Sequence, residues 1–410
     1  MNIQTVNFLY ILQSILHGGE PSLSSPDWEQ IFKMANLHNL LPAVYEAVSP
    51  LPSFAEAPDQ VKKSFLEGAV GQSGGQFLRT EEFLSLSDTL RAEGLTPLVL
   101  KGLVCRYLYR EPDLRPSGDE DLLIRKEELP RYDAILRREG YRPDLEGEAG
   151  HLEEVQELTY ESPTLTLEIH VNPFGVDTEA RRRMNDLFRD PFPRSVTLDI
   201  GGHAIRTLCP TDHYLFLFCH LYKHFLAGGV GIRHLMDLLL FRQTCEKDID
   251  FPTVIRGIRT VGGEIFYSAV LEIGRRYLGF SSIPASRKAP DVQPLLEDIL
   301  ESGCFGNSTR VQRLGAAYIT ADIQSEEKRR FRLLPLLFPP ARQLYHSYPV
   351  LLDHPGVLPA VWCVRIGRLL KETALTDHGL LLKSLRHGKK RARILRRYRM
   401  TPEDKSLRRH

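Results

Sequence analysis

From Asn2 to about Glu93 the apolar residues recur at intervals of three and four positions, which is the spacing of one face of an α-helix. The pattern is clearest from Trp28 to Ala35 and from Leu40 to Val44. The segment from Val61 to Gly94 is expected to form one or two longer helices. Residues 1–93 are therefore predicted to be an N-terminal helical region.

Residues 94–208 follow a different pattern, in which short apolar runs alternate with turn residues. Such runs predict strands, and the pair Gly201-Gly202 predicts the turn of a hairpin. The middle of the chain is therefore expected to be a small α/β unit. The expected strands are Leu98–Leu100, Leu122–Ile124, Val155–Tyr160 and Leu165–Val171, with a hairpin over Val196–Arg206, and the expected helices are Leu103–Tyr109 and Lys126–Gly140.

Residues 209–382 return to helical spacing, beginning with an apolar helix from near Pro210 through His224. Residues 383–410 then carry twelve Lys or Arg against two acidic residues. This basic tail is a candidate contact for RNA or acidic lipid, although a frayed and solvated C-terminal helix is the commoner outcome. Further helical segments are expected at Ile232–Gln243, Pro252–Leu278, Val292–Ser302 and, interrupted by prolines, Phe331–Leu370.

Composition narrows the class of protein. A chain of 410 residues with 42% hydrophobic residues is able to bury a substantial core, and its net charge of +1 gives no overall attraction for nucleic acid or membranes. Six cysteines without CxxC pairs are typical of reduced thiols in a cytoplasm. The N-terminus lacks the basic region of a signal peptide, and no apolar run has the length of a membrane-spanning helix.

The strongest chemical signal is an alternation of acidic residues at the start of a predicted strand. Asp119 and Asp121 are two positions apart, so their side chains face the same side, whereas Glu120 faces the other. Glu168 is a single charge inside a second apolar strand and is costly to bury alone. If the two strands are neighbours, the three carboxylates form a site for Mg²⁺ or Mn²⁺, and Glu168 acts as a ligand or as a general base. The spacing alone is equally consistent with a solvated turn.

Two basic positions are candidates for phosphate binding. Lys101-Gly102 follows a predicted strand and precedes a helix, so the turn offers backbone N–H groups and one ammonium to a phosphate. A solvated loop lysine is the alternative. Arg115 has the geometry to hold a phosphate on two nitrogens, but an arginine paired to an acid is nearly as plausible.

These residues resemble the uncharacterised nucleotidyltransferase branch of the DNA polymerase β-like superfamily. The resemblance implies an α+β fold, with a small mixed β-sheet nucleotidyltransferase core flanked by helical N-terminal and C-terminal regions. It implies transfer of a nucleoside monophosphate that depends on Mg²⁺, with Asp119, Asp121 and Glu168 as metal-binding and catalytic carboxylates. The matching words are Val99-Leu100-Lys101-Gly102, Tyr109, Leu114 to Ile124, Gly140-Tyr141, Leu167 to His170, Cys209 to His213, His220 to His224, Asp237, Leu337 to Pro339 and Tyr348-Pro349.

One word departs from the wider superfamily, where the turn is usually Gly-Ser or Gly-Gly. Here it is Lys101-Gly102, so either Lys101 replaces the usual serine contact to the phosphates or the nucleotide binds differently. The residues assigned to the nucleotide are Lys101, Gly102, Arg115, Gly118, Lys223 and His224.

Two other patterns compete for a function. His213, His220 and His224 share one face of a helix, as metal ligands do, but no HExxH glutamate accompanies them. Histidines that line the cleft with Lys223, or core histidines bonded to backbone carbonyls, are the preferred alternatives. Gly71-Gln72-Ser73-Gly74-Gly75 matches the serine-hydrolase elbow in letters, but the preceding residues favour a helix and not the required strand. Its small residues are more simply explained by two helices that approach closely.

The sequence therefore predicts a cytoplasmic enzyme that moves NMP from an NTP to an unidentified acceptor, which is a small molecule, a saccharide or a protein hydroxyl. The alternative is a catalytically silent nucleotide-binding or scaffolding protein. A third reading, RNA end modification, depends on the basic tail, which is the only part of the chain that predicts a nucleic-acid partner.

Overall fold

The computed structural model describes residues 1–144, 157–176, 179–285, 290–303, 338–341, 344–345, 347–376 and 380–398, with the backbone alone over 369–376 and 380–388. Parts of three predicted segments lie outside these ranges. They are residues 155–156 of a predicted strand, residues 331–337, 342–343 and 346 of the proline-interrupted segment and residues 399–410 of the basic tail.

The N-terminal region is helical, as predicted. Asn2 and Asp27 accept backbone N–H groups at the starts of the first two helices, which satisfies donors that a helix leaves unpaired. The segment after Pro58 forms one uninterrupted helix of 34 residues. The helices are α1 (Ile3–His17), α2 (Trp28–Leu37), α3 (Leu41–Val48), α4 (Pro52–Ala55) and α5 (Asp59–Ala92).

The hydrolase-like Gly71 to Gly75 segment lies inside α5, so no strand precedes Ser73 and the elbow is absent. The expectation that its glycines allow a close helix approach is wrong at Gly71 and Gly74, because a Cβ there would meet nothing within 4 Å. The close approach occurs one turn earlier, where a Cβ on Gly68 would lie 2.4 Å from Leu41.

Seven strands form one mixed sheet in the order β3-β4-β5-β2-β1-β7-β6. The expected hairpin is confirmed, with Gly201 and Gly202 at φ values of 60° and 85° in its turn. The two-residue strand β3 had no sequence signal. The strands are β1 (Leu98–Val99), β2 (Glu120–Leu123), β3 (Arg142–Pro143), β4 (Leu158–Glu161), β5 (Thr166–His170), β6 (Val196–Ile200) and β7 (His203–Thr207).

The helices between the strands are shorter than predicted. The helix α6 is a single turn (Leu103–Arg106) and does not reach Tyr109. The predicted Lys126–Gly140 helix begins as a 3-10 turn, η2 (Lys126–Glu128), and continues as α7 (Leu129–Arg138). Gly140 then has a φ of 91°, a conformation that favours glycine. The remaining short elements here are η1 (Pro112–Leu114), α8 (Glu179–Asp186) and η4 (Phe192–Arg194).

The C-terminal region is helical in its described part, with one correction. The segment Pro252–Leu278 is two helices, because Gly262 at a φ of 70° breaks it. Gly263 is confined there, since a Cβ would lie 2.6 Å from Phe218. The helices are α9 (Pro210–Ala227), α10 (Ile232–Thr244), α11 (Phe251–Thr260), α12 (Glu264–Tyr277), α13 (Gln293–Ser302), α16 (Val350–Asp353), α17 (Leu358–Thr376) and α18 (Leu380–Tyr398), with the 3-10 turn η6 (Pro355–Val357).

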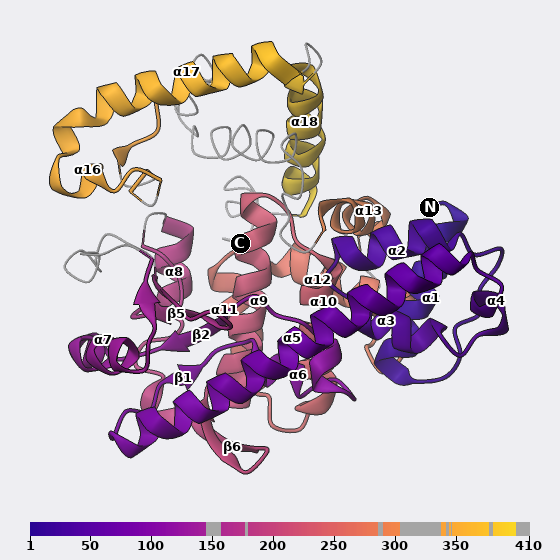
Figure 1. Ribbon diagram of the computed structural model, residues 1–410, viewed down its shortest axis with the longest axis horizontal. Helices are drawn as coiled ribbons and strands as arrows, with labels where there is room; N and C mark the ends of the chain where they lie inside the picture. The colour runs from indigo at the N-terminus through magenta and orange to yellow at the C-terminus, as the bar shows by residue number, and fades with distance from the viewer. Residues whose placement is uncertain are drawn as a thin grey trace, which may run out of the picture.

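One hydrophobic core joins the N-terminal helices, the sheet and the C-terminal helices, from Phe8 to Tyr398. Figure 1 shows α5 crossing the molecule in front of the sheet and α9 running through its middle. A second, small apolar cluster lies around Leu351 near α16. Within the described ranges, no helix has the length and apolarity needed to cross a lipid bilayer.

The frayed-tail expectation is wrong for the described end of α18. Ile394, Leu395 and Tyr398 are buried in the main core, and the buried guanidinium of Arg391 is paired with Asp298 of α13. The apolar face of α18 therefore packs on the core, while the basic residues that stay exposed in its described part are Lys389, Lys390, Arg393, Arg396 and Arg397.

A buried ion pair fixes the start of β2. Glu120 Oε1 lies 2.5 Å from Arg106 Nη1, and Glu120 Oε2 accepts the N–H of Leu103 at 2.8 Å. Glu120 thus points away from Asp119 and Asp121, as the strand alternation predicts. Gly102 lies directly against this carboxylate, because a Cβ there would be 2.1 Å from Glu120 Oε2.

We expect Gly102→Ala to destabilise the fold, since the new methyl group meets the Glu120 carboxylate and residue 102 has a φ of 42°. The free energy of unfolding should fall by about 2–4 kcal/mol. Gly74→Ala, in the open middle of α5, is the matched control and should raise it by about 0.5–1 kcal/mol. Chemical denaturation measures both, and equal effects would contradict this account.

Candidate active site

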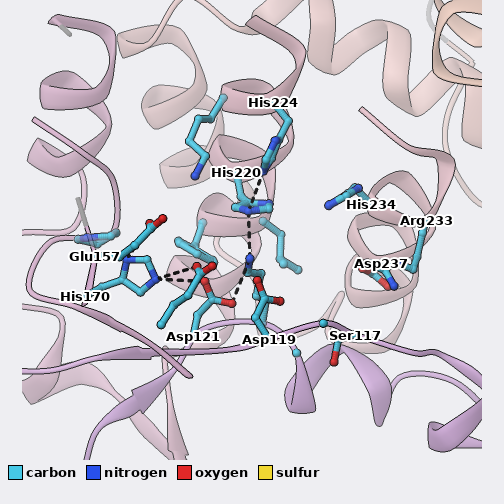
Figure 2. A pocket seen from close by; sticks show the side chains of 18 of the residues that line it. Ser117, Asp119, Asp121, Glu157, His170, His220, His224, Arg233, His234 and Asp237 are labelled. Atoms are coloured by element: carbon cyan, nitrogen blue, oxygen red, sulfur yellow. Dashed lines mark hydrogen bonds and ion pairs between the residues drawn. The ribbon is translucent and has the colours of Figure 1, made fainter. Parts of the chain in front are cut away.

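A cavity of about 330 Å³ lies between the sheet and the helices α9 and α10. All nine predicted site residues line it, although the sequence takes them from four separate segments. Figure 2 shows Asp119, Asp121 and His170 on the sheet side and His220, His224 and His234 on the helix side. The nine residues are Lys101, Gly102, Arg115, Gly118, Asp119, Asp121, Glu168, Lys223 and His224.

The carboxylates meet because β2 and β5 are parallel neighbours. Their register places Asp121 beside Glu168, and directly paired positions face the same side of a sheet. Asp119 precedes Asp121 by two residues and lies directly before the first residue of β2. The structure therefore brings the three predicted carboxylates to one wall of the cavity.

Lys101 lies between the two walls. Its Nζ is 3.0 Å from Asp121 Oδ2 and 3.3 Å from His220 Nε2. Burial lowers the pKa of Lys101, but the charges of the three carboxylates outweigh burial and hold that pKa above its usual value. Lys101 is thus a charged residue whose side chain is only 17% exposed, and the solvated-loop interpretation is wrong.

His170 completes the acidic wall. Its Nε2 lies 3.1 Å from Asp121 Oδ1 and 3.6 Å from Glu168 Oε2. Burial opposes its protonation, but hydrogen bonds to both carboxylates raise the pKa of His170 to about 9. Burial also raises the pKa of Glu168 to about 7. A carboxyl group with that pKa is suited to exchange a proton at neutral pH.

Asp121 differs from Glu168 in its electrostatics. Burial would raise the pKa of Asp121, but the Lys101 ammonium and the His170 hydrogen bond hold it well below the usual value. Two carboxylates on adjacent strands therefore have pKa values on opposite sides of the ordinary range. Such a separation is typical of sites where one carboxylate stays ionised and another transfers protons.

The helix wall contains three histidines. His220 and His224 are one turn apart on α9, and their Nε2 atoms lie 3.2 Å from each other. The ring of His234, from α10, is centred 5.6 Å from each of them. His213 is not part of this group, because its Nδ1 lies 3.1 Å from Thr207 Oγ1 and its ring packs on Phe241. His213 therefore does not join His220 and His224, and of the alternatives weighed for these histidines the core interpretation holds for His213.

Arg115 is bound to an acid, which was the alternative to phosphate binding. Its Nε and Nη2 lie 3.1 Å and 2.6 Å from the two oxygens of Asp237, which also accepts the hydroxyl of Tyr109 at 2.8 Å. The pair joins α10 to the residue that directly follows the η1 turn. The third guanidinium nitrogen, Nη1, is buried without a hydrogen-bond partner in the part of the chain that the structure describes.

One backbone N–H at the Lys101-Gly102 turn is already occupied. The N–H of Leu103 is already bound by Glu120, and α6 is only four residues long. Lys101 itself, and not the helix end, therefore offers the positive charge at this turn.

Sequence reasoning missed His170, His234 and Glu157, all of which line the cavity. His170 follows Glu168 by two positions, so strand alternation was a sufficient signal for it. His234 had no local signal, because only the packing of α10 on α9 brings it to His220. Glu157 lies 3.9 Å from His170 Nδ1 at the start of the strand β4 and had no pattern of its own.

A family model described as an uncharacterised nucleotidyltransferase matches residues 24–279, which is more than half of the chain. The matched range contains every residue of the cavity named above. No curated protein and no solved structure matches the chain.

Buried neutral histidines make stability depend on pH. Burial lowers the pKa of His38 and His213 to about 4, against 6.5 for an exposed histidine. Between these values the unfolded chain binds protons that the folded chain does not, so the free energy of unfolding should fall as pH is lowered. The loss should approach about 1.4 kcal/mol per pH unit for each histidine.

Denaturation curves between about pH 7 and pH 5 measure this slope. The variant His213→Gln should have a shallower slope, whereas His354→Gln, at an exposed position, should leave it unchanged. A slope that His213→Gln does not alter would contradict the assignment.

Proposed function

The chain belongs to the family of uncharacterised nucleotidyltransferases, and from that premise we propose that it transfers a nucleoside monophosphate from an NTP to an acceptor hydroxyl. The observation that carries the proposal is the pairing of Asp121 with Glu168 on parallel strands, facing a cationic wall across one cavity. A carboxylate wall suits divalent metal, and a cationic wall suits phosphate.

Both the charge of the acidic wall and its donor atoms suit Mg²⁺. The Lys101 ammonium already lies among the three carboxylates, so the wall attracts a cation. Oxygen donors of this kind are the ones that Mg²⁺ prefers, and Asp119, Asp121 and Glu168 would hold it. When bound, the ion supplies positive charge that stabilises the phosphorane-like transition state.

The protein side chains divide the remaining work. Glu168 accepts the proton of the acceptor hydroxyl as its oxygen bonds to the α-phosphorus. The bond from the α-phosphorus to the bridging oxygen breaks, and pyrophosphate leaves with those electrons. His170 orients Asp121 and Glu168 through its ring nitrogen. Lys101 turns from Asp121 toward the phosphates, and Lys223 meets them from the helix wall.

The same proposal covers the architecture. We place the sheet in the DNA polymerase β-like superfamily and assign catalysis to residues 94–208, since all described strands lie between Leu98 and Thr207. Residues 1–93 and 209–382 then act as helical flanks, and α9 and α10 from the second flank close the cavity over the nucleotide.

We expect the double variant Asp119→Asn, Asp121→Asn to lose NTP binding that depends on Mg²⁺ and to lower turnover at least about a hundredfold, because both metal ligands lose their charge. Isothermal titration with each NTP and pyrophosphate release measure the two effects. Glu127→Gln, at an exposed acid after β2, is the control and should be neutral. NTP binding without any pyrophosphate release, across a screen of acceptors, would favour a silent nucleotide-binding protein instead.

Lys101 competes with metal for the same carboxylates in the absence of nucleotide. We therefore expect Lys101→Gln to bind Mn²⁺ about tenfold more tightly, while turnover falls because a charge on the phosphates is lost. Titration of Mn²⁺ without nucleotide checks the affinity, with Lys389→Gln at an exposed position as control. Weaker Mn²⁺ binding by Lys101→Gln would show that the carboxylates are not the metal site.

A further inference from the structure

Three histidines meet on the helix wall of the cavity and are not used in the transfer chemistry above. One ring nitrogen from each of His220, His224 and His234 lies within 4.8 Å of the others. Burial is the main reason that the pKa of each is held well below the usual value. Three neutral imidazoles in contact, at the surface of a cavity, are either metal ligands or acceptors of protons.

The distances between the histidine nitrogens would by themselves allow a metal ion to bind among the three rings. The 3.2 Å between the Nε2 atoms of His220 and His224 is close to the edge of a zinc tetrahedron, about 3.4 Å. The positive charges around the three rings argue against a metal ion at this place. The Lys101 ammonium lies 3.3 Å from the same His220 nitrogen, and Lys223 is on the same face of α9. A second cation placed here would meet fixed positive charges, and Asp237, the carboxylate that α10 contributes to the cavity lining, is already paired with Arg115.

The same charges favour an anion. Positive charge from Lys101 and Lys223 lowers the pKa of His220 and His224, so both rings sense a positive potential. Arg115 adds a guanidinium that is 4% exposed and whose Nη1 has no hydrogen-bond partner in the described structure. An entering polyphosphate would neutralise this potential and give each ring N–H an acceptor.

We propose that His220, His224 and His234 form a phosphate subsite that takes up protons when the polyphosphate of a nucleotide enters the cavity. The inference rests on the proposed function, since it concerns the donor nucleotide of that reaction. It makes nucleotide binding tighter as pH falls, because protons are taken up with the ligand. Release of pyrophosphate would return those protons.

Other charged groups face the three rings and contribute to the same equilibrium. Two of them titrate near neutral pH: burial raises the pKa of Glu168 to about 7, and burial and neighbouring cations lower the pKa of Lys223 to about 8. An arginine at this position keeps the charge and removes the titration. Besides Lys223, these groups are Lys101, Arg115, Arg181 and Arg233 on the positive side, Asp237 on α10 beside them, and Asp119, Asp121, Glu157, Glu168 and His170 across the cavity.

The experiment is isothermal titration of each NTP with Mg²⁺ into Lys223→Arg protein, at about pH 7.5, in two buffers of different ionisation enthalpy. The difference in heat gives the number of protons taken up. Phosphate groups with a second pKa near 6 are already deprotonated there. The same measurement is made with His224→Gln and His234→Gln in that background, with His354→Gln as the control.

We expect Lys223→Arg protein to take up about one proton or more when NTP binds. For each proton taken up, the affinity for NTP should rise about tenfold for every unit by which the pH is lowered. Each glutamine variant should take up at most half as many, and the control should be unchanged. Circular dichroism establishes that the variants are folded.

NTP binding without proton uptake, or equal uptake in the glutamine variants, would overturn the subsite and leave the proposed function standing. Tight Zn²⁺ binding that the glutamine variants lose, with unaltered NTP binding, would overturn it in favour of a metal site. Failure of every NTP to bind would overturn the proposed function together with the inference.

Discussion

The site depends on the alternation of three acidic residues across the edge of one strand. Glu120 faces inward, where Arg106 and the N–H of Leu103 neutralise it, and this contact anchors the Lys101-Gly102 turn beside β2. Asp121 faces the cavity and pairs with Lys101 of that same turn. Reversing the alternation would bury two carboxylates where the structure provides one arginine, at a cost of several kcal/mol.

The cavity results from two surfaces of opposite charge that are held apart. On the sheet side, backbone pairing between β2 and β5 forces carboxylates together despite their repulsion. On the helix side, burial keeps the histidines neutral while lysines and arginines remain charged. Lys101 contacts both surfaces and partly neutralises the acidic one. A ligand that carries both metal and phosphate would complement both surfaces, as a metal-bound nucleotide does.

The ion pair between Arg115 and Asp237 explains how the two surfaces are kept in position. It joins the segment before β2 to α10, and both partners are buried. Arg233, one turn before Asp237, donates to the carbonyl of Pro116 in the same segment. Removing one partner of such a pair leaves an uncompensated buried charge, so the pair acts on the geometry of the cavity as well as on the stability of the fold.

The sequence by itself determined the helical flanks, the hairpin, the positions of the main strands along the chain and the side of β2 on which each carboxylate lies. These features follow from periods of about 3.6 and 2 residues, which are local properties of the chain. Local spacing also contained the signal that puts His170 on the face of Glu168, although sequence reasoning did not use it. Prediction from local spacing failed at the ends of helices, because side-chain contacts decide where a helix ends. The helix α6 stops after one turn, and Gly262 divides a segment that was predicted as one helix.

Only the tertiary structure decided which partners meet across the cavity. The sequence grouped His213 with His220 and His224, yet packing turns His213 to Thr207 and brings His234 from another helix. It left Lys101 and Arg115 between two interpretations each, and burial beside Asp121 and Asp237 now places both in ion pairs. The pair of Arg115 with Asp237 joins residues more than a hundred positions apart. The energies of such contacts depend on burial and on neighbouring charge, which no local pattern of residues contains.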